Sequence, residues 1–343
     1  MRSKKEKPYK DFFANYLQDV FWLRMGIPWF RPLVTNLYVT KRCNLRCRYC
    51  DAPGNEPDSN TSLLLSILEK IRPHNPALNF TGGEPLLYEN LGILLQKAKT
   101  LRFYPILLST NALLVDRIIS DLDLIDHLVV SLDSLDEQVN DTICGVKGST
   151  REIIENIKRC ASIARVNSLR LSVHSVITPE TLEGVEEIVG FCEGLNITFT
   201  LSPEHGRFSP NESLFDNDRY RDLINRLIDF KRVGKPIASS FSYLRTIRDF
   251  PEHRCHPFLS PRVQPDGGVY FPCEAIKERH FYLQNFVSLY KLMQQEGELT
   301  SRPECSRRCY LACFIEVETY IRRPLAILEE RHMRQWVFGK RHS

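Results

Sequence analysis

Short apolar runs alternate with amphipathic runs along most of this chain. In the amphipathic runs, apolar residues recur every three or four positions, as on one face of a helix, at 61–71, 91–101, 115–122, 150–164 and 181–192. The apolar runs are short enough to be buried strands, at 33–39, 77–80, 105–109, 127–132, 168–177 and 196–201. Strands that alternate with helices form a parallel sheet with the helices outside it. The pattern therefore predicts an α/β fold of six βα-type units.

The two ends of the chain differ from this alternation. Residues 11–30 carry many aromatic and aliphatic residues near helical spacing, and basic residues flank them at Lys4, Lys5, Lys7, Lys10 and Arg24. We expect residues 1–32 to form a helical segment that packs on the main domain; a helix lying on a membrane surface is the alternative. A further helix is predicted at 219–232. Residues 326–343 are expected to form a basic tail. The sequence contains no run of 18 uncharged apolar residues, so no membrane-spanning helix is predicted.

Composition narrows the class of protein. The 343 residues are 43% hydrophobic and 26% charged, which is ordinary for a globular protein and long enough for one large domain plus a smaller one. A net charge of +4 is too small to indicate a nucleic-acid partner. Eleven cysteines without a recognisable signal peptide predict a reducing, cytoplasmic compartment, in which clustered cysteines are metal ligands.

Residues 40–51, TKRCNLRCRYCD, hold the densest group of cysteines. Cys43, Cys47 and Cys50 follow the spacing C-x₃-C-x₂-C. Thiolates favour iron–sulfur clusters and zinc, but a zinc site usually opens with C-x₂-C and needs a fourth ligand. A [4Fe–4S] cluster held by three thiolates leaves one iron open to a substrate or cosubstrate. The spacing therefore indicates such a cluster, with a structural zinc site as the alternative.

At this loop the chain resembles the radical S-adenosylmethionine (SAM) superfamily, whose signature also carries an aromatic residue where Tyr49 lies. The resemblance implies a partial (βα)₆ barrel, here over 33–235. It implies that the open iron binds the amino and carboxylate groups of SAM. It also implies that an electron, from a reductant such as ferredoxin or flavodoxin, cleaves SAM to a 5′-deoxyadenosyl radical. That radical would abstract hydrogen from a small-molecule or peptide substrate.

The resemblance also indicates residues that bind SAM. Gly82-Gly83-Glu84-Pro85, after the second predicted strand, looks like the motif that binds the amino group of SAM. Other candidates end the third and fourth strands, where parallel barrels place their chemistry. A hydrogen-bonded strand end is the alternative role for these. The predicted SAM-binding residues are Tyr49, Gly82, Gly83, Glu84, Thr110, Asn111, Ser131 and Asp133.

One departure from the family is visible after the fourth strand. Many relatives carry an Arg-Gly pair there, whereas this chain has Cys144 before Gly145, so no contact by that arginine is carried over. Cys160 and Cys192 lie in helical runs and are expected to be buried as small hydrophobic residues. Candidate substrate-contacting residues on or after strands five and six are His174, Ser202, Glu204 and His205.

A second group of cysteines lies near the C-terminus. Pro265-Asp266-Gly267-Gly268 predicts a hairpin turn with 269–271 as the return strand. The Gly268-x₄-Cys273 portion resembles the auxiliary-cluster domains called SPASM and twitch, here over 236–325. This resemblance implies one auxiliary [4Fe–4S] cluster; a zinc site is the alternative. The cluster is an electron relay if all four ligands come from the protein, and it could bind substrate if one iron is open. Its ligands would be Cys255, Cys273 and two or three of Cys305, Cys309 and Cys313.

These patterns together predict a radical SAM enzyme that modifies a peptide, a small-molecule natural product or a cofactor. The aromatic, basic N-terminal segment keeps open a lipid or isoprenoid modifier at a membrane surface. A non-catalytic metal-binding protein is a third possibility, but such a protein has no need of the Gly82-Gly83-Glu84 motif. The sequence does not name the substrate.

Overall fold

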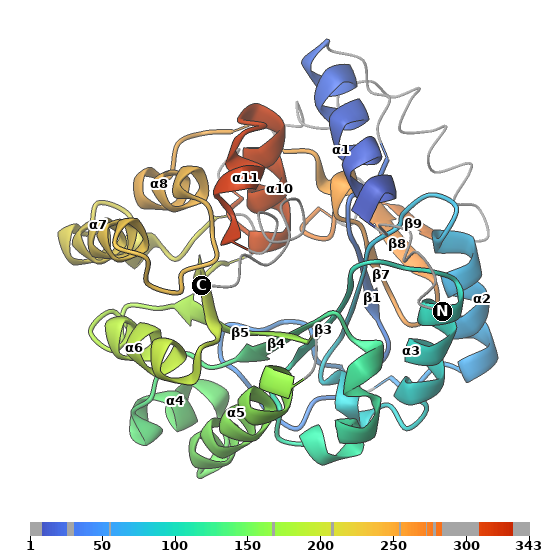
Figure 1. Cartoon of the computed structure of the whole chain (residues 1–343), viewed down its shortest axis with the longest axis horizontal. Coiled ribbons are helices and arrows are strands. Elements are labelled where there is room, and N and C mark those ends of the chain that lie inside the picture. The colour runs from blue at the N-terminus through green and yellow to red at the C-terminus, as the bar shows by residue number, and fades with distance from the viewer. Residues whose placement is uncertain are drawn as a thin grey trace.

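A nine-stranded sheet forms the centre of the molecule (Figure 1). The computed structural model describes residues 9–25, 31–54, 56–166, 169–206, 209–253, 255–271, 273–276, 279–282 and 309–331. The strands are β1 (Thr35–Tyr38), β2 (Leu78–Thr81), β3 (Ile106–Thr110), β4 (His127–Ser131), β5 (Arg170–Ile177), β6 (Thr198–Pro203), β7 (Arg262–Val263), β8 (Gly268–Phe271) and β9 (Arg279–Tyr282). Their order is β6-β5-β4-β3-β2-β1-β7-β8-β9, and β1 to β7 are parallel.

Helices line the outer face of the curved sheet (Figure 1). They are α1 (Tyr9–Arg24), α2 (Thr61–Ile71), α3 (Leu91–Thr100), α4 (Glu137–Cys144), α5 (Ser149–Val166), α6 (Val185–Leu195), α7 (Asp218–Arg232), α8 (Phe241–Asp249), α10 (Ala312–Arg322) and α11 (Ala326–Glu329). Short 3₁₀ helices are η1 (Pro85–Leu87), η2 (Val115–Arg117), η3 (Ile119–Leu124), η4 (Glu212–Leu214) and η5 (Pro257–Leu259). Six consecutive parallel strands with helices outside confirm the predicted α/β partial barrel.

Two local predictions need correction. The helix expected at 115–122 is instead the pair of 3₁₀ helices η2 and η3. This stretch is rich in serine and aspartate, whose side chains compete for backbone hydrogen bonds and disfavour a regular α-helix. Helix α4 was not expected, although Asp136 caps its N-terminus and Gly145 ends it in the left-handed conformation.

Apolar and polar rows alternate across the sheet, because side chains at matched positions of parallel strands share a face. The apolar rows are buried beneath the helices and include Leu37, Phe80, Leu108, Leu128, Leu171, Val130, Val173 and Phe199. The rows between them face the barrel interior and include Asn36, Asn79, Ser109, His127, Ser172, His174, Thr198 and Thr200. The interior of this barrel is therefore lined mainly by hydrogen-bonding side chains.

The predicted hairpin after Pro265 extends the sheet beyond β1. Gly267 adopts φ +83°, which suits glycine, and the strands β7 and β8 run antiparallel on either side of the turn. A Cβ on Gly268 would lie 1.7 Å from the Nε2 atom of His280, so any other residue there would displace that exposed ring. The hairpin that carries Gly268 thus continues the barrel sheet through the β1–β7 pair.

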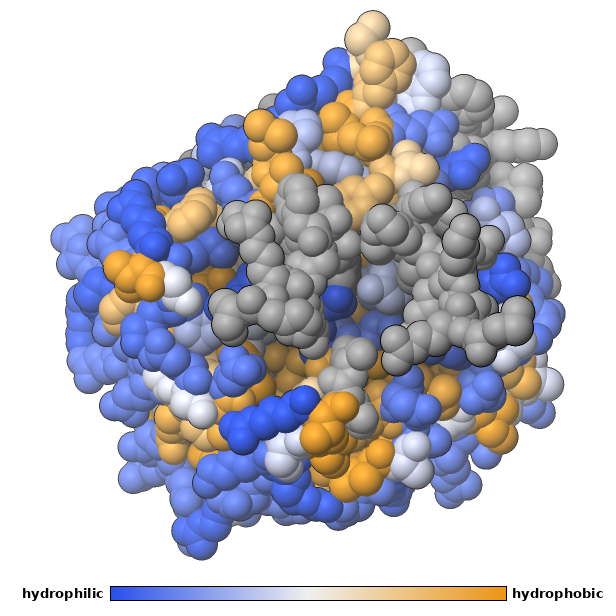
Figure 2. Space-filling model, viewed as in Figure 1, coloured by the Kyte–Doolittle hydropathy of each residue, from blue (hydrophilic) through white to orange (hydrophobic). Residues whose placement is uncertain are grey.

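The N-terminal helix α1 packs against α10 near the other end of the chain (Figure 1). Phe12 and Tyr16 are buried in this contact, which agrees with a packed helix. Leu17, Phe21 and Met25, four residues apart, are between 57% and 64% exposed on its outer face. Hydrophobic residues are visible at that edge of the molecule in Figure 2. Within the described residues, no helix is long and apolar enough to cross a membrane.

Candidate cluster and cofactor site

The cysteine loop follows β1, at the edge where the carboxyl ends of the parallel strands meet. Cys43 and Cys47 are half-buried and Cys50 is exposed. The backbone N–H of Leu45 donates to the Cys43 Sγ atom at 3.4 Å, and the N–H of Cys50 donates to the Cys47 carbonyl at 3.0 Å. Burial raises the pKa of the Cys43 thiol to about 11, so a bound cation is needed to keep it a thiolate at neutral pH.

Three thiols in one loop suit a polynuclear cluster better than a single ion. In the described part of the chain, no three His, Cys, Asp or Glu side chains converge closely enough to hold one metal ion. Cysteine thiolates are the donors that iron–sulfur clusters use, so this donor set fits the cluster expected from the spacing.

Gly82 and Gly83 let two loops touch. A Cβ on Gly82 would lie 2.3 Å from the Thr40 carbonyl oxygen, and one on Gly83 would lie 2.2 Å from that of Arg42. The N–H groups of Gly83 and Glu84 donate to these carbonyls at 2.9 and 2.7 Å. These glycines thus hold the cysteine loop in place by direct backbone contact.

Glu84 lies at the centre of a buried hydrogen-bond network. Its carboxylate accepts hydrogen bonds from the Thr110 hydroxyl at 2.7 Å, from the Asn111 N–H at 2.8 Å and from the Leu86 N–H at 2.9 Å. Asn111 in turn donates through Nδ2 to the Oδ1 atom of Asn44, inside the cysteine loop, at 2.7 Å. Burial raises the pKa of Glu84 despite these donors. The structure thus brings together three of the predicted SAM-binding residues and adds Asn44, which the sequence did not single out.

Asp133 joins the end of β4 to the cysteine loop. Its Oδ2 atom accepts the Tyr49 hydroxyl hydrogen bond at 2.6 Å, and its Oδ1 atom accepts from the Val176 N–H at 2.8 Å. Burial raises the pKa of Asp133 to about 6. Ser131 is exposed at the end of β4, beside His174 in the strand register. Tyr49, Ser131 and Asp133 therefore lie at the same edge as the cysteines.

The C-terminal end of helix α4 lies against the cysteine loop. The N–H groups of Arg46 and Arg48 donate to the carbonyls of Cys144 and Ile143, at 2.8 and 3.1 Å. These two bonds lie on either side of Cys47 and hold it beside the end of α4, where Cys144 is buried. The neighbouring Cys144 thiol and burial raise the pKa of Cys47. Cys160 and Cys192, by contrast, are buried as predicted.

The predicted substrate residues separate into two groups. His174 bridges two neighbours inside the barrel, with Nδ1 3.0 Å from the Thr200 hydroxyl and Nε2 3.1 Å from that of Ser202. Burial lowers the pKa of His174 to about 4, so the ring is neutral at pH 7. Glu204 and His205 lie in the turn after β6, where Glu204 accepts from Asn211 at 2.6 Å.

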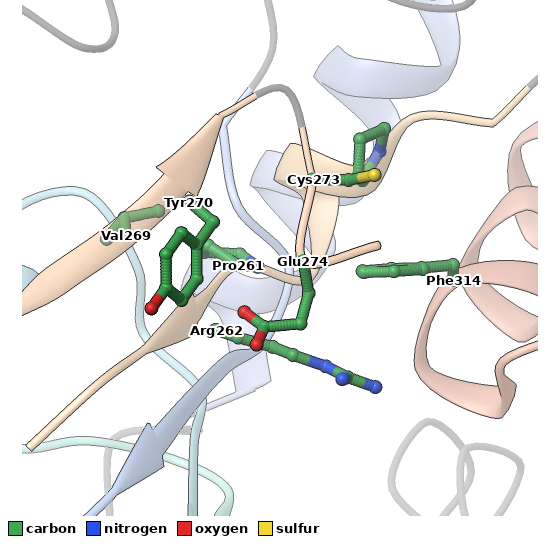
Figure 3. A pocket seen from close by; sticks show the side chains of 8 residues that line it. Pro261, Arg262, Val269, Tyr270, Cys273, Glu274 and Phe314 are labelled. Carbon is green, nitrogen blue, oxygen red and sulfur yellow. The ribbon is translucent and has the colours of Figure 1, made fainter. Parts of the chain in front are cut away.

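The C-terminal cysteines are described in part. Cys255 is buried, and Cys273 and Cys309 are half-buried. Cys305 and the side chain of Cys313 lie outside the described residues. Cys273 borders a cavity whose other lining residues are Pro257, Pro261, Arg262, Val269, Tyr270, Glu274 and Phe314 (Figure 3).

Arg262 connects this cavity with the first cysteine loop. Its guanidinium lies 5.4 Å from the ring centre of Phe314. Burial raises the pKa of Cys50, and the charge of Arg262 partly offsets that effect. An arginine therefore lies near both groups of cysteines.

His253 is a buried imidazole that the sequence did not single out. It is 4% exposed, and neither ring nitrogen makes a hydrogen bond of good geometry within the protein. Its ring centre lies 5.0 Å from that of Tyr310, the residue after Cys309, and His253 precedes Cys255 by two positions. Burial lowers the pKa of His253, while Glu318 and the backbone of Pro251 and Cys309 act in the opposite direction.

Comparison with known proteins agrees with this geometry. Residues 37–192 match the family model of the Radical SAM superfamily. A probable GTP 3′,8-cyclase of Methanococcus aeolicus is 26% identical over 222 residues, which cover 60% of this chain and 71% of that protein.

Solved structures of two other proteins share the fold. SuiB of Streptococcus suis bound to S-adenosylmethionine aligns with a TM-score of 0.63 at 20% identity, covering 96% of this chain and 82% of SuiB. In another SuiB structure the match covers 72% of this chain and 61% of that one. The anSMEcpe protein with bound AdoMet and a peptide aligns with a TM-score of 0.59 at 16% identity, covering 80% and 88% of the two chains.

Proposed function

We propose that this chain, an enzyme of the Radical SAM superfamily by its match over residues 37–192, cleaves S-adenosylmethionine reductively to modify a polar substrate inside its barrel. The observation that carries this proposal is the contact between the cysteine loop and the Gly82-Gly83 loop at the carboxyl edge of the sheet. The superfamily implies a [4Fe–4S] cluster and SAM as cofactors.

Cys43, Cys47 and Cys50 would hold the cluster. When bound, it supplies an open iron for SAM and the electron that yields the 5′-deoxyadenosyl radical. The chain's own part is to fix the ligands and shield the site. Gly82 and Gly83 fix the loop, and the network of Glu84 and Asn44 fixes its interior.

The backbone around Gly82 and Gly83, with Ser131 at the next open strand end, is the surface that would bind the amino acid part of SAM. Glu84, Thr110 and Asn111 support that surface through their buried hydrogen bonds. Tyr49 and Asp133 fix the other side of the loop through their 2.6 Å hydrogen bond.

A polar substrate is supported by the rows that face the barrel interior. His174 is neutral and shares hydrogen bonds with Thr200 and Ser202, and His127 does the same with Ser172 at 2.7 Å. Such a lining can exchange hydrogen bonds with the amides and hydroxyls of a substrate, which a hydrocarbon chain cannot do. A peptide or a polar small molecule fits this interior better than an isoprenoid. SuiB bound to its precursor peptide SuiA and the GTP 3′,8-cyclase represent those two substrate classes among the similar proteins.

The C-terminal cysteines would hold one auxiliary [4Fe–4S] cluster as an electron relay. Cys255, Cys273 and Cys309 are the described thiols of this group, and the buried imidazole of His253, two positions before Cys255, is a further candidate ligand. The charge of Arg262 between the two cysteine groups would favour electron transfer toward either cluster, because it stabilises the reduced, more negative state.

One observation favours a second candidate, lipid or isoprenoid modification at a membrane surface. Leu17, Phe21 and Met25 form an exposed apolar stripe on α1, next to a basic N-terminal sequence. Sedimentation with anionic vesicles, weakened by salt and by changing the three stripe residues to serine, would support this candidate. Failure of the wild-type protein to sediment would remove it.

The proposed activity is tested on anaerobically reconstituted protein reduced with dithionite. The wild type should release 5′-deoxyadenosine from SAM, Cys50→Ala should not, and Cys160→Ala, a matched cysteine away from the loop, should retain activity. GTP, a cysteine-containing peptide and geranylgeranyl diphosphate are then compared as substrates. Stimulation by the diphosphate alone would contradict the polar-substrate proposal, and SAM cleavage by Cys50→Ala would contradict the cluster assignment.

A further inference from the structure

A cavity of about 260 Å³ lies between the neighbouring helices α7 and α8 (Figure 1). Its walls carry three arginines and one aspartate, and none of them belongs to the proposed cluster and cofactor site. The residues that line it are Asn225, Ile228, Asp229 and Arg232 of α7 and Arg245 and Arg248 of α8. The cavity is therefore a separate, basic site in the layer of helices outside the sheet.

Two hydrogen bonds hold the walls of this cavity together. The hydroxyl of Tyr220 on α7 donates to the carbonyl of Ile247 on α8 at 2.9 Å, and both residues are buried. The Nη1 group of Arg248 donates to the Oδ1 atom of Asn225 at 2.9 Å, across the same pair of helices. The relative position of the two helices is thus fixed by contacts within the protein.

Arg245 is the arginine of this cavity whose guanidinium is least used. It is half-buried, and it forms no hydrogen bond or ion pair with any residue in the described part of the chain. Its guanidinium carbon lies 5.9 Å from the ring centre of Phe241, a cation–π contact that occupies none of its N–H donors. Arg245 therefore brings a full positive charge and a complete set of donors to the cavity.

Arg232 and Arg248 are each paired with one acid of their own helix. Arg232 donates to Asp229 at 2.6 Å, and Arg248 donates to Asp249 at 2.7 and 2.8 Å. Such partly exposed pairs are weak, so both arginines can turn some of their N–H groups to a bound anion. With two carboxylates against three guanidiniums, the group keeps a net positive charge.

We infer that this cavity binds the phosphate group of a small organic ligand. A phosphate group presents three acceptor oxygens, which suits guanidinium forks that reach it from two helices. Because a water molecule takes about 30 Å³, the cavity has room for more than a phosphate ion. It is smaller than the sites of drug-sized molecules, which begin at about 300 Å³, so the organic part is small. The inference does not depend on the proposed cleavage of SAM.

Isothermal titration calorimetry of the reconstituted protein with glycerol 3-phosphate, at constant ionic strength, tests the inference. The wild type should bind this ligand more tightly than inorganic phosphate and should not bind glycerol. Arg245→Gln should weaken the binding about tenfold or more, because a charge-assisted hydrogen bond is lost. Arg219→Gln is the matched control and should bind as the wild type does, since this exposed arginine of α7 pairs with Glu183 and does not line the cavity.

A second variant covers the case in which Arg245→Gln does not fold. Arg232 is exposed at the end of α7, so Arg232→Gln should fold and should again lower the affinity for glycerol 3-phosphate. The inference is overturned if the wild type does not bind this ligand, if it binds inorganic phosphate as tightly, or if the variants with a changed cavity arginine bind as the wild type does. Cys50→Ala should retain the binding, and its loss there would place the ligand at the cysteine loop and overturn the inference.

Discussion

Tyr16 of α1 donates its hydroxyl hydrogen bond to the carbonyl of Pro324, at 2.8 Å and across 308 residues of sequence. The same hydroxyl lies 3.0 Å from the Tyr320 carbonyl oxygen, and the Tyr16 side chain is 2% exposed. The N-terminal helix is thus fixed to the last helices of the described chain. It contributes to the stability of the C-terminal segment that follows the auxiliary cysteines.

Tyr16→Phe should therefore destabilise the protein although the ring remains. The two carbonyls lose a buried donor, which costs about 1–3 kcal/mol. Denaturant unfolding measures the change, and Phe21→Ala on the exposed face of the same helix is the control, expected to stay within about 0.5 kcal/mol. An equal loss in both variants would mean that the hydroxyl contributes nothing specific.

The burial of Asp19, on the same helix, predicts that the stability of the folded protein depends on pH. It is fully buried, its Oδ1 atom accepts from the Arg31 N–H at 2.9 Å, and its Oδ2 atom has no hydrogen-bond partner. Burial raises the pKa of Asp19 from 3.8 to about 7. The folded state then binds a proton that the unfolded state has released, so this residue makes stability fall as pH rises from about 4 to 7.

Asp19→Asn should remove this loss of stability at rising pH. Above pH 7 the variant should be more stable than the wild type by up to a few kcal/mol, and near pH 4 the two should be similar, because Asp19 is then protonated in the folded protein. Unfolding curves at both pH values measure the difference, and Asp116→Asn, an exposed aspartate, is the control. A constant difference at all pH values would contradict the raised pKa.

Gly83→Ala should disturb the cysteine loop without unfolding the barrel. The new Cβ would lie 2.2 Å from the Arg42 carbonyl oxygen and 2.7 Å from that of Lys41, and backbone cannot yield there without moving the loop. We expect loss of most reconstituted iron with an unchanged circular dichroism spectrum. Gly190→Ala is the matched control, since a Cβ at this exposed helical position meets nothing within 4 Å and should stabilise α6 by about 0.5–1 kcal/mol. Normal iron content in Gly83→Ala would contradict the close contact.

The sequence predicted those parts of the site that depend on local pattern. The cysteine spacing, Gly82-Gly83 and the strand ends each follow from a few adjacent residues, and the parallel sheet then brings them to one edge. The backbone hydrogen bonds from Arg46 and Arg48 to the end of α4 could not be predicted in this way, because they depend on how α4 docks after β4. The caps of α4 at Asp136 and Gly145 were readable, but not the face that the helix presents.

The hydrogen bonds of Glu84 and the burial of His253 also could not be predicted from local sequence pattern. A Gly-Gly-Glu sequence does not reveal that the carboxylate faces Thr110 and Asn111, which come from the neighbouring strand. Nor does a single histidine reveal that its ring will be buried against that of Tyr310. Both facts arise from tertiary packing between segments that are distant in sequence.

The last prediction separates an auxiliary cluster from a zinc site. A variant with Cys43, Cys47 and Cys50 all changed to alanine loses the first site. If the C-terminal cysteines hold a [4Fe–4S] cluster, this variant should still bind about four irons per chain and absorb as an iron–sulfur protein. Adding Cys273→Ala should remove that iron, and adding His253→Phe should lower it, since the phenylalanine fills the volume without a ligand nitrogen. Cys192→Ala, a buried helical cysteine, is the control and should change nothing. Stoichiometric zinc without iron in the triple variant would show that these residues form a structural zinc site, which carries no electrons.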